Sequence, residues 1–355
     1  MTKNSQHRIL YRVEQLPIFQ NRMYDSEIEA KNCPKGDVCL VEDHDTGLVY
    51  NASFVPELMI YDQHYQNEQA VSPLFQQHLN DVLSIIKTNM GKDDLVEVGC
   101  GKGFFLEMLL KDDFKITGFD PTYEGINPNI EKEYFTSNTG IKSKGIVLRH
   151  VLEHIQNPID FLFQLKESNG GSGKIYIEVP CFDWICKHYA WFDIFYEHVN
   201  YFRLTDFHHI FTDVLASGKL FEGQYIYVVA ELSSLQIPKI NNSCRVNFPL
   251  DFLQKLKDHQ INQEAKSAIW GGASKGVIFA LLNSRLGSLI DIVIDINPAK
   301  QNKYLPGTGI KVRSESEVFD LLPSKSTIFI MNSNYLEEIK KMSKYLFNYV
   351  SIDNE

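Results

Sequence analysis

The residues best suited to chemistry begin at a glycine-rich turn after an apolar segment. Leu95–Gly99 is predicted to be a strand, and the turn that leads into the next helix contains Gly99, Gly101 and Gly103. Glycine lacks a side chain, so a ligand can approach the backbone of such a turn closely. Ligands of open α/β sheets lie at the carboxyl ends of the strands. Asp120 ends the next predicted strand, where its carboxylate can accept hydrogen bonds from two ribose hydroxyls.

The spacing of the three glycines separates two classes of ribose-containing cofactor. A nicotinamide-binding turn has the pattern GxGxxG, whereas this chain has GxGxG and carries Phe104 at the place of the last glycine. The stretch resembles the ExGxGxG motif of class I S-adenosylmethionine (SAM)-dependent methyltransferases. The resemblance implies SAM as the cofactor, bound by Glu97, Gly99, Gly101, Gly103 and Asp120. A nicotinamide oxidoreductase, or a tight turn without a ligand, is the alternative.

A second motif follows the predicted strand Gly145–Arg149. The sequence HVLEH at positions 150–154 resembles the segment of the same family that forms one wall of the SAM pocket. Arg149 and His150 are therefore predicted to contact the cofactor. Glu153 and His154 are predicted to begin a solvated helix.

The aromatic-rich segment 191–202 contains the candidate acid–base residues. Histidine titrates near neutral pH, so His198 can take a proton from a substrate. The adjacent Glu197 can hold the imidazole ring or raise its basicity. A buried structural histidine is the alternative, and on composition alone it is the more common case.

The same segment resembles a motif, approximately Tyr-x-Glu-His, of the sugar C-methyltransferases of deoxysugar biosynthesis. The resemblance implies that His198 is the general base. It also implies an N-terminal zinc-binding unit, a central SAM domain and a C-terminal α/β domain. Phe195 stands where the family has tyrosine, so Tyr196 or Tyr201 is expected to supply the phenolic hydrogen bond to the substrate. Two further substrate contacts are implied in the N-terminal region: Tyr61 and Tyr65.

The last third of the chain repeats the pattern of strand, glycine turn and helix. The sequences WGGASKG at 270–276 and DINPAKQNKYLPGT at 295–308 resemble two segments of that family's C-terminal domain. Backbone NH groups at a helix start, together with the Lys275 ammonium, can hold a diphosphate. Ser274, Lys275 and Gly276 are therefore predicted to bind the substrate, for which the resemblance implies a nucleotide-linked sugar. An ordinary capped turn is the alternative.

The N-terminal region lacks the cysteine pairs that hold zinc in the family that it resembles. The six cysteines form no CxxC pair, and Asp43 and Thr46 occupy the places of the family's second cysteine pair. We predict that no zinc is bound there. A solvated loop is expected instead, with one alternative ligand set: Cys33, Cys39, Asp43 and His44.

Composition narrows the class of partner. The 355 residues carry a formal net charge of −10, which argues against a nucleic-acid partner. No apolar run is long enough to cross a bilayer, and no secretory signal is evident. Unpaired cysteines suit a reducing cytoplasm. We expect a cytoplasmic protein with a small-molecule substrate, either a monomer or a homodimer.

Strands that alternate with helices predict a doubly wound, Rossmann-like α/β fold. We expect a small, irregular N-terminal unit at 1–72, a SAM-dependent methyltransferase domain at 73–240 and a second Rossmann-like α/β domain at 241–355. In the central domain, Gln224–Ala230 is predicted to be an edge strand. In the last domain, Asp251–Lys266 is predicted to be a helix.

Together these features predict C-methylation of a nucleotide-linked keto-deoxysugar. His198 would remove a proton next to the ketone, and the enolate carbon would attack the SAM methyl group. Two alternatives remain open. One is O- or N-methylation of another glycan or small metabolite, and the other is a non-catalytic binding protein that keeps the SAM fold.

Overall fold

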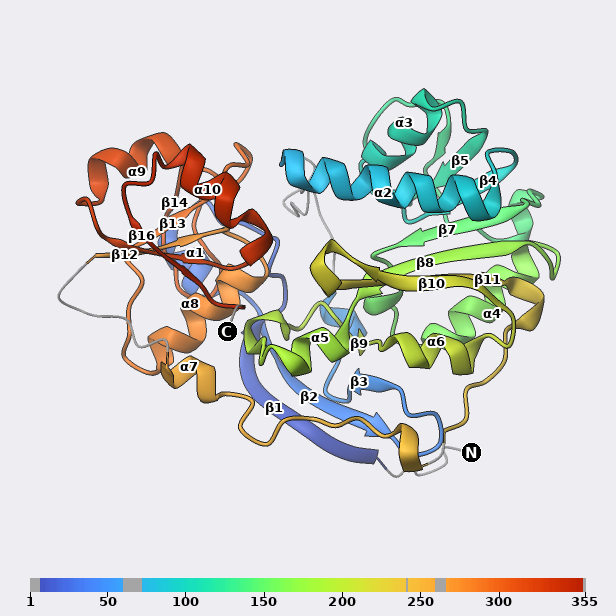
Figure 1. The fold of residues 1–355 in the computed structure, drawn as a ribbon, viewed down its shortest axis with the longest axis horizontal. Helices are drawn as coiled ribbons and strands as arrows, with labels where there is room; N and C mark the ends of the chain where they lie inside the picture. Colours follow the sequence, from blue (N-terminus) through green and yellow to red (C-terminus); the bar gives the residue numbers. More distant parts are fainter. Residues whose placement is uncertain (1–6, 60–71, 241, 259–265, 354–355) are drawn as a thin grey trace.

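The computed structural model describes residues 7–59, 72–240, 242–258 and 266–353. These residues form three β-sheets with helices packed around them (Figure 1). The N-terminal strands run along the bottom of the view, the central sheet and its helices lie on the right, and the C-terminal unit lies on the left. The expected α/β architecture with a second, C-terminal α/β unit is confirmed.

The central sheet has seven strands. They are β4 (Leu95–Val98), β5 (Ile116–Phe119), β6 (Ile130–Glu131), β7 (Gly145–Arg149), β8 (Lys174–Pro180), β10 (Val214–Leu220) and β11 (Tyr225–Glu231). Their order is β10-β11-β8-β7-β4-β5-β6, and β11 runs in the direction opposite to the other six strands. Parallel strands that are covered on both faces read as continuous apolar runs. Accordingly, β4, β7 and β8 are buried along nearly their whole length.

One predicted strand position is wrong. The sequence predicts Gln224–Ala230 as an edge strand, but β11 lies between β8 and β10, and β10 forms the edge. Strand β10 escaped prediction because its residues are half-buried or exposed throughout, so it has no apolar run.

Helices cover both faces of the central sheet. Helices α2 (Pro73–Met90) and α3 (Phe104–Lys111) lie on one face, and α4 (Pro158–Ser168) and α6 (Leu204–Ile210) lie on the other (Figure 1). Ser72 caps α2 by accepting a hydrogen bond from the backbone NH of Phe75. Helix α3 begins directly after Gly103, so the first glycine turn fixes the start of this helix. The short helix α5 (Phe182–Lys187) follows β8.

The C-terminal unit is a five-stranded parallel sheet. Its strands are β12 (Ser267–Trp270), β13 (Ile292–Ile294), β14 (Val312–Arg313), β15 (Thr327–Ile330) and β16 (Asn348–Ser351), in the order β14-β13-β12-β15-β16. Its helices are α8 (Lys275–Arg285), α9 (Glu315–Leu321) and α10 (Leu336–Met342). The predicted helix over 251–266 is α7 (Gln254–Asp258) in the structure, and residues 259–265 lie outside the described part.

The N-terminal unit is more regular than predicted. Strand β1 (His7–Pro17) pairs with β2 (Lys35–Asp43), β2 pairs with β3 (Val49–Asn51), and the short helix α1 (Glu27–Lys31) lies between β1 and β2. Two register shifts interrupt β1, so its buried residues do not alternate and its sequence hides the strand.

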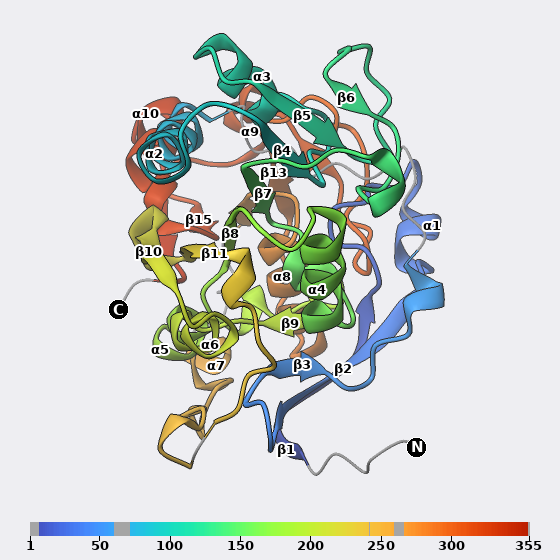
Figure 2. The same cartoon turned by 90° about the vertical axis from the view of Figure 1, so that its right-hand side faces the viewer.

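The last strand of the N-terminal sheet comes from the middle of the chain. Strand β9 (Asn200–Tyr201) pairs with β3, so the segment that carries Glu197 and His198 is tied to the N-terminal unit. In Figures 1 and 2, β1 and β2 pass below the central sheet. In the part of the chain that is described, no helix has the length and apolarity needed to cross a membrane. The domain limits at 72 and 240 stay predictions.

Candidate active site

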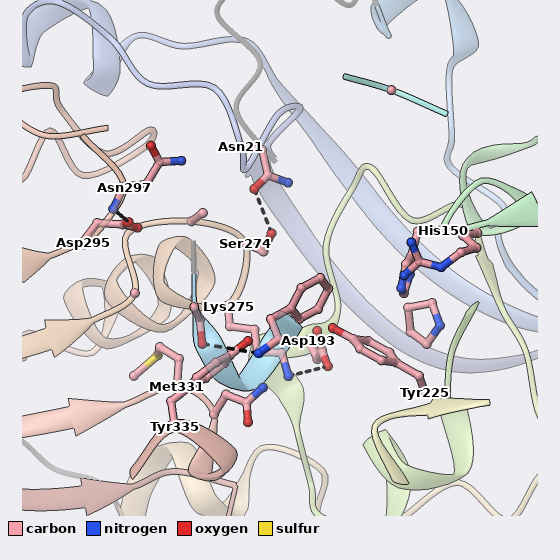
Figure 3. A pocket seen from close by; sticks show the side chains of 18 of the residues that line it. Asn21, His150, Asp193, Tyr225, Ser274, Lys275, Asp295, Asn297, Met331 and Tyr335 are labelled. Atoms are coloured by element: carbon pink, nitrogen blue, oxygen red, sulfur yellow. Dashed lines mark hydrogen bonds and ion pairs between the residues drawn. The ribbon is translucent and has the colours of Figure 1, made fainter. Parts of the chain in front are cut away.

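A cavity of about 410 Å³ opens at the carboxyl ends of the central strands, where the three parts of the chain meet (Figure 3). The N-terminal unit contributes Asn21, the central domain its glycine turn and the end of β7, and the C-terminal unit the turn after β12. Eight of the predicted site residues line it: Glu97, Gly99, Gly101, Arg149, His150, His198, Ser274 and Lys275. Open α/β sheets bind ligands at this edge, so the cavity is the candidate active site.

The first glycine turn is shaped to admit a ligand. Gly99, Gly101 and Gly103 have φ angles of +72°, +55° and +81°, which favour glycine. A Cβ on Gly101 would meet no atom within 4 Å, so its open side faces free space in the cavity. A Cβ on Gly103 would overlap Ile130 instead. Gly101 therefore leaves room for a ligand, and glycine is favoured at Gly103 by its left-handed backbone.

Two carboxylates stand beside this turn in different states. Glu97 is buried, burial raises its pKa to about 7, and its Oε2 atom has no hydrogen-bond partner in the described residues. Asp120 is satisfied: its Oδ2 accepts from the NH of Gly101 at 2.8 Å, and its Oδ1 accepts from the NH and hydroxyl of Thr122. Asp120 thus holds the turn in place, and Glu97 offers an unused oxygen to a ligand.

A buried carboxylate that sequence reasoning missed organises the wall beside β7. Glu178 accepts hydrogen bonds from Nε of Arg149 at 2.8 Å and from the hydroxyl of Tyr176 at 3.2 Å, and it lies 2.7 Å from Nε2 of His78. Burial alone would raise the pKa of Glu178, but Arg149 and the two histidines His78 and His150 hold it well below its usual range. No motif indicates Glu178, because it lies inside an apolar strand and its partners come from α2 and β7.

His150 is held between two acids. Its Nδ1 lies 3.2 Å from Oε1 of Glu153, and its Nε2 lies 3.4 Å from Oε1 of Glu178 in a poorly aligned contact. Burial lowers the pKa of His150, but the two carboxylates have the larger, opposite effect. The pKa is therefore raised from 6.5 to about 9. His150 therefore carries a positive charge at neutral pH.

Glu153 and His154 are not the solvated helix start that the sequence predicts. They lie in a short 3₁₀ helix, Leu152–His154, that turns into the cavity at the end of β7. Glu153 is 1% exposed, and its Oε2 has no hydrogen-bond partner in the described residues. His154 donates from Nδ1 to the backbone carbonyl of Glu197 at 2.9 Å.

His198 faces the cavity without a hydrogen bond to any described residue. Its ring lies 4.1 Å from that of Phe195 and 5.0 Å from that of His154, centroid to centroid. Burial, and then the nearby His154, His150 and Lys275, hold the pKa of His198 well below its usual range. The imidazole is therefore neutral, and its lone pair is available.

Each of the two glycine turns lies in a segment that matches a methyltransferase family model. Residues 62–214 match the family model of a methyltransferase domain, and residues 246–349 match that of a C-methyltransferase C-terminal domain. The chain is a SAM-dependent methyltransferase. Two features of this methyltransferase fit a bound SAM molecule: the open Gly101, and the Oε2 atom of Glu97, which has no hydrogen-bond partner in the described residues.

Solved structures resemble less than half of this methyltransferase. The methyltransferase domain of a bacterial Hen1 is 18% identical (TM-score 0.34; 44% of this chain and 98% of that chain covered). A SAM-dependent methyltransferase from Aquifex aeolicus is 17% identical (0.34; 45% and 94%). The plantazolicin methyltransferase BpumL in complex with SAH is 15% identical (0.36; 46% and 86%). None of the curated proteins compared with the chain matches it.

The structure corrects the predicted contact between Glu197 and the His198 ring. The Glu197 carboxylate of the methyltransferase accepts hydrogen bonds from the backbone NH groups of Gln20 and Asn21. Glu197 is 1% exposed and does not line the cavity. It therefore holds the N-terminal loop against the active site, and its backbone carbonyl orients His154.

The hydroxyls of Tyr196 and Tyr201, which are predicted to hydrogen-bond the substrate in place of the family's tyrosine, bond to backbone groups of the protein. The Tyr196 hydroxyl accepts a hydrogen bond from the NH of Val55 at 2.9 Å. The Tyr201 hydroxyl bonds to the backbone NH and carbonyl of Phe195, at 3.1 and 3.2 Å. Neither residue lines the cavity, and their contact with a substrate stays a prediction. Tyr61 and Tyr65 lie outside the described residues.

The C-terminal wall of the cavity is formed by the turn after β12 and the start of α8. Its main charged side chain, Lys275, already has partners within the chain. Lys275 of the methyltransferase forms an ion pair with Asp193 at 3.1 Å (Figure 3). It also donates to Oε1 of Gln224 at 3.0 Å and lies over the ring of Trp184. A Cβ on Gly276 would overlap the carbonyl oxygen of Gly271, so this glycine is required by backbone packing and does not line the cavity. The substrate contact of Gly276 stays a prediction.

One group of potential metal ligands is present in the residues that the structure describes. Glu153, His154 and His198 each offer one ligand atom, and these atoms lie within 4.8 Å of one another. In the N-terminal unit, Oδ1 of Asp43 accepts hydrogen bonds from the NH and hydroxyl of Thr46, at 2.7 and 2.8 Å. A hydrogen-bonded turn thus stands where the resembling family has a cysteine pair.

Proposed function

We propose that this methyltransferase C-methylates a nucleotide-linked keto-deoxysugar, with His198 as the general base. The observation that carries the proposal is a neutral imidazole that faces a cavity between a methyltransferase domain and a C-methyltransferase C-terminal domain, with no hydrogen bond to any described residue. A base needs a free lone pair within reach of the substrate.

SAM supplies an electrophilic methyl group when it is bound. Three features of the chain would hold it: the open face of Gly101, the Glu97 oxygen without a hydrogen-bond partner in the described residues, and the turn that Asp120 fixes. His198 takes a proton from the carbon next to the substrate ketone. The imidazolium that forms then lies close to the enolate and offsets its negative charge. The ring of Phe195 packs against His198 and excludes water from one side of it.

The C-terminal wall supports a nucleotide carrier. Ser274 lies at the start of α8 and faces the cavity, and Lys275 and Lys300 line the same wall. Each ammonium group has a carboxylate partner, Asp193 for Lys275 and Asp295 for Lys300. A diphosphate would exchange with these carboxylates and accept hydrogen bonds from the lysines and the helix start.

The test is incubation of the protein with SAM and a panel of nucleotide-linked keto-sugars, with products identified by mass and NMR. His198→Asn is expected to keep SAM-induced thermal stabilisation and to lose methyl transfer by at least about 100-fold. His208→Asn changes an exposed histidine outside the cavity and serves as the matched control. Retained turnover in His198→Asn would remove this residue from the mechanism.

Deuterium exchange separates carbon from oxygen or nitrogen methylation. With a carbon base, the substrate C–H next to the ketone is expected to exchange in D₂O before methyl transfer, and His198→Asn is expected to stop this exchange. Methylated product without any such exchange in the unreacted substrate, and with the methyl group on oxygen or nitrogen, would contradict C-methylation.

A further inference from the structure

Three side chains in the cavity have the composition of a transition-metal site. Glu153, His154 and His198 provide one carboxylate oxygen and two imidazole nitrogens, all within 4.8 Å of one another. Zinc sites of this ligand type have bonds of about 2.0–2.2 Å, which places tetrahedral ligand atoms roughly 3.4 Å apart. Shifts of about 1 Å in the side chains are therefore sufficient to close the three ligands around one ion.

The backbone already holds the two ligand-bearing segments together. The NH of Val199 donates to the carbonyl of Glu153 at 2.8 Å. The amide of Asn200 donates to the carbonyls of Leu152 and Ile155, at 3.2 and 2.6 Å. These bonds lie beside the ligands, so the scaffold is rigid and only side-chain torsions need to adjust on metal binding.

The hydrogen bonds of the three side chains leave metal-binding lone pairs unused. His154 donates its Nδ1–H to the Glu197 carbonyl, which leaves Nε2 as an acceptor; metal-bound histidines are commonly held in this way. Oε2 of Glu153 is buried without a partner in the described residues. His198 has no hydrogen bond to any described residue. All three therefore present a lone pair that no described hydrogen bond uses.

We propose that Glu153, His154 and His198 bind a divalent transition-metal ion such as Zn²⁺ or Co²⁺, and that this ion switches methyl transfer off. Two imidazoles and one carboxylate suit these ions better than Mg²⁺ or Ca²⁺, which prefer oxygen ligands. All three residues line the cavity, so a further ligand such as water would reach the ion from there. The inhibitory part rests on the proposed function, since a metal on His198 occupies the lone pair that would take the substrate proton.

Nearby cations limit the strength of this site. His150 contacts Glu153, and Lys275 also lines the cavity, so both oppose an added positive charge. Cys100 lines the cavity as well, but it is outside the ligand group. We therefore expect reversible binding that a chelator removes, and not a permanently held structural ion.

Metal binding is tested first, on the full chain without substrate. Chelator-treated protein is titrated with Co²⁺ in the visible spectrum and with Zn²⁺ by calorimetry. One ion per chain is expected, and Glu153→Gln and His154→Asn are each expected to weaken binding at least about tenfold. Asn keeps a side-chain NH donor for the Glu197 carbonyl while removing Nε2. The matched control His44→Asn alters an exposed N-terminal histidine and is expected to bind like the wild type.

Inhibition is tested separately by methyl-transfer assays with and without Zn²⁺. Wild-type activity is expected to fall with Zn²⁺ and to return with chelator, and the residual activity of Glu153→Gln is expected to resist Zn²⁺. Absence of Zn²⁺ binding, or binding that only His44→Asn weakens, overturns the site. Binding at the three residues without inhibition overturns the switch and the base role of His198. Failure of the metal-free protein to methylate any substrate counts against the proposed function alone, because the binding result stands without turnover.

Discussion

The two glycine turns are held by the same type of hydrogen bond, from a backbone NH of the turn to the acid after the neighbouring strand. In the first, the NH of Gly101 donates to Oδ2 of Asp120 at 2.8 Å. In the second, the NH of Gly272 donates to Oδ2 of Asp295 at 2.9 Å. In both, the other oxygen of the acid accepts from the NH two residues later. An acid after the neighbouring strand therefore fixes a glycine turn whether or not a ligand binds there.

The turns differ in what surrounds them. Gly101 opens onto free space, whereas a Cβ on Gly276 would overlap a carbonyl oxygen of its own turn. Glu97, two residues before the first turn, is buried, and its Oε2 has no hydrogen-bond partner among the described residues; the same place in β12 is occupied by the fully buried Ile269. The buried acid beside the first turn lowers the stability of the fold when it is ionised, whereas the second turn is closely packed against its own backbone. Unfilled space at the glycine and a buried oxygen without a hydrogen-bond partner in the described residues, not the glycine pattern, distinguish the turn that is expected to hold SAM.

The largest expected effect comes from adding a methyl group to each turn. Gly276→Ala places a Cβ against the rigid carbonyl of Gly271, so it is expected to lower the free energy of unfolding by roughly 3 kcal/mol or more. Gly101→Ala meets no atom and is expected to lose only about 1–2 kcal/mol, because of its positive φ. Urea unfolding followed by circular dichroism measures both. Equal losses would mean that the two turns are not different in packing.

The second prediction concerns the buried acid beside the first turn. Burial raises the pKa of Glu97 from 4.5 to about 7, so the folded state loses stability as pH rises from 4.5 to 7, and the full cost is present above pH 7. At pH 8, Glu97→Gln is expected to stabilise the SAM-free protein by an amount on the order of 3 kcal/mol. At pH 4 the gain is expected to vanish.

The same variant should lose part of the stabilisation that SAM gives, since it removes the carboxylate that faces the cofactor. Thermal unfolding at pH 4 and pH 8, with and without SAM, measures both effects. A Glu97→Gln variant that is less stable than the wild type at pH 8 would show that the acid has an unrecognised partner.

The third prediction compares the two turn-fixing acids directly. Asp120→Asn and Asp295→Asn each replace one carboxylate oxygen with an amide, so similar losses of unfolding free energy, about 1–2 kcal/mol, are expected. Only Asp120→Asn is expected to weaken SAM binding, by about tenfold, or 1.4 kcal/mol. Calorimetry with SAM on both variants is the measurement. Equal weakening by Asp295→Asn would place SAM contacts on the C-terminal turn.

The fold was predictable where strands are apolar and punctuated by glycine. The strands β4 and β7 lie within one residue of their predicted limits, because buried parallel strands have continuous apolar sequences. Strands β1 and β10 were missed, since bulges and half-exposure removed the pattern.

The candidate site was predictable only in its motif residues. His198 was found from its neighbours in sequence, but the direction of the Glu197 carboxylate depends on Gln20 and Asn21, which lie about 177 positions away. Glu178 likewise acquires its role from contacts with α2 and β7. Long-range contacts of this kind leave no local pattern.

The smallest expected effect tests whether the second turn serves packing or ligand binding. Lys275 pairs with Asp193 across the boundary between the central and C-terminal units, and both side chains are mostly buried. Lys275→Met keeps the aliphatic stem over Trp184 and removes the charge, so a loss of about 1 kcal/mol in unfolding free energy is expected. SAM affinity is expected to be unchanged.

A double-mutant cycle with Asp193→Asn isolates this ion pair, because the second substitution should cost little once its partner is gone. A coupling free energy of about 1 kcal/mol is expected in the substrate-free protein, and it measures the packing role of the pair. The proposed diphosphate contact also predicts that Lys275→Met raises KM for the nucleotide-linked substrate. An unchanged KM would assign Lys275 to packing alone, whereas a raised KM would make both turns ligand sites that differ in what they bind.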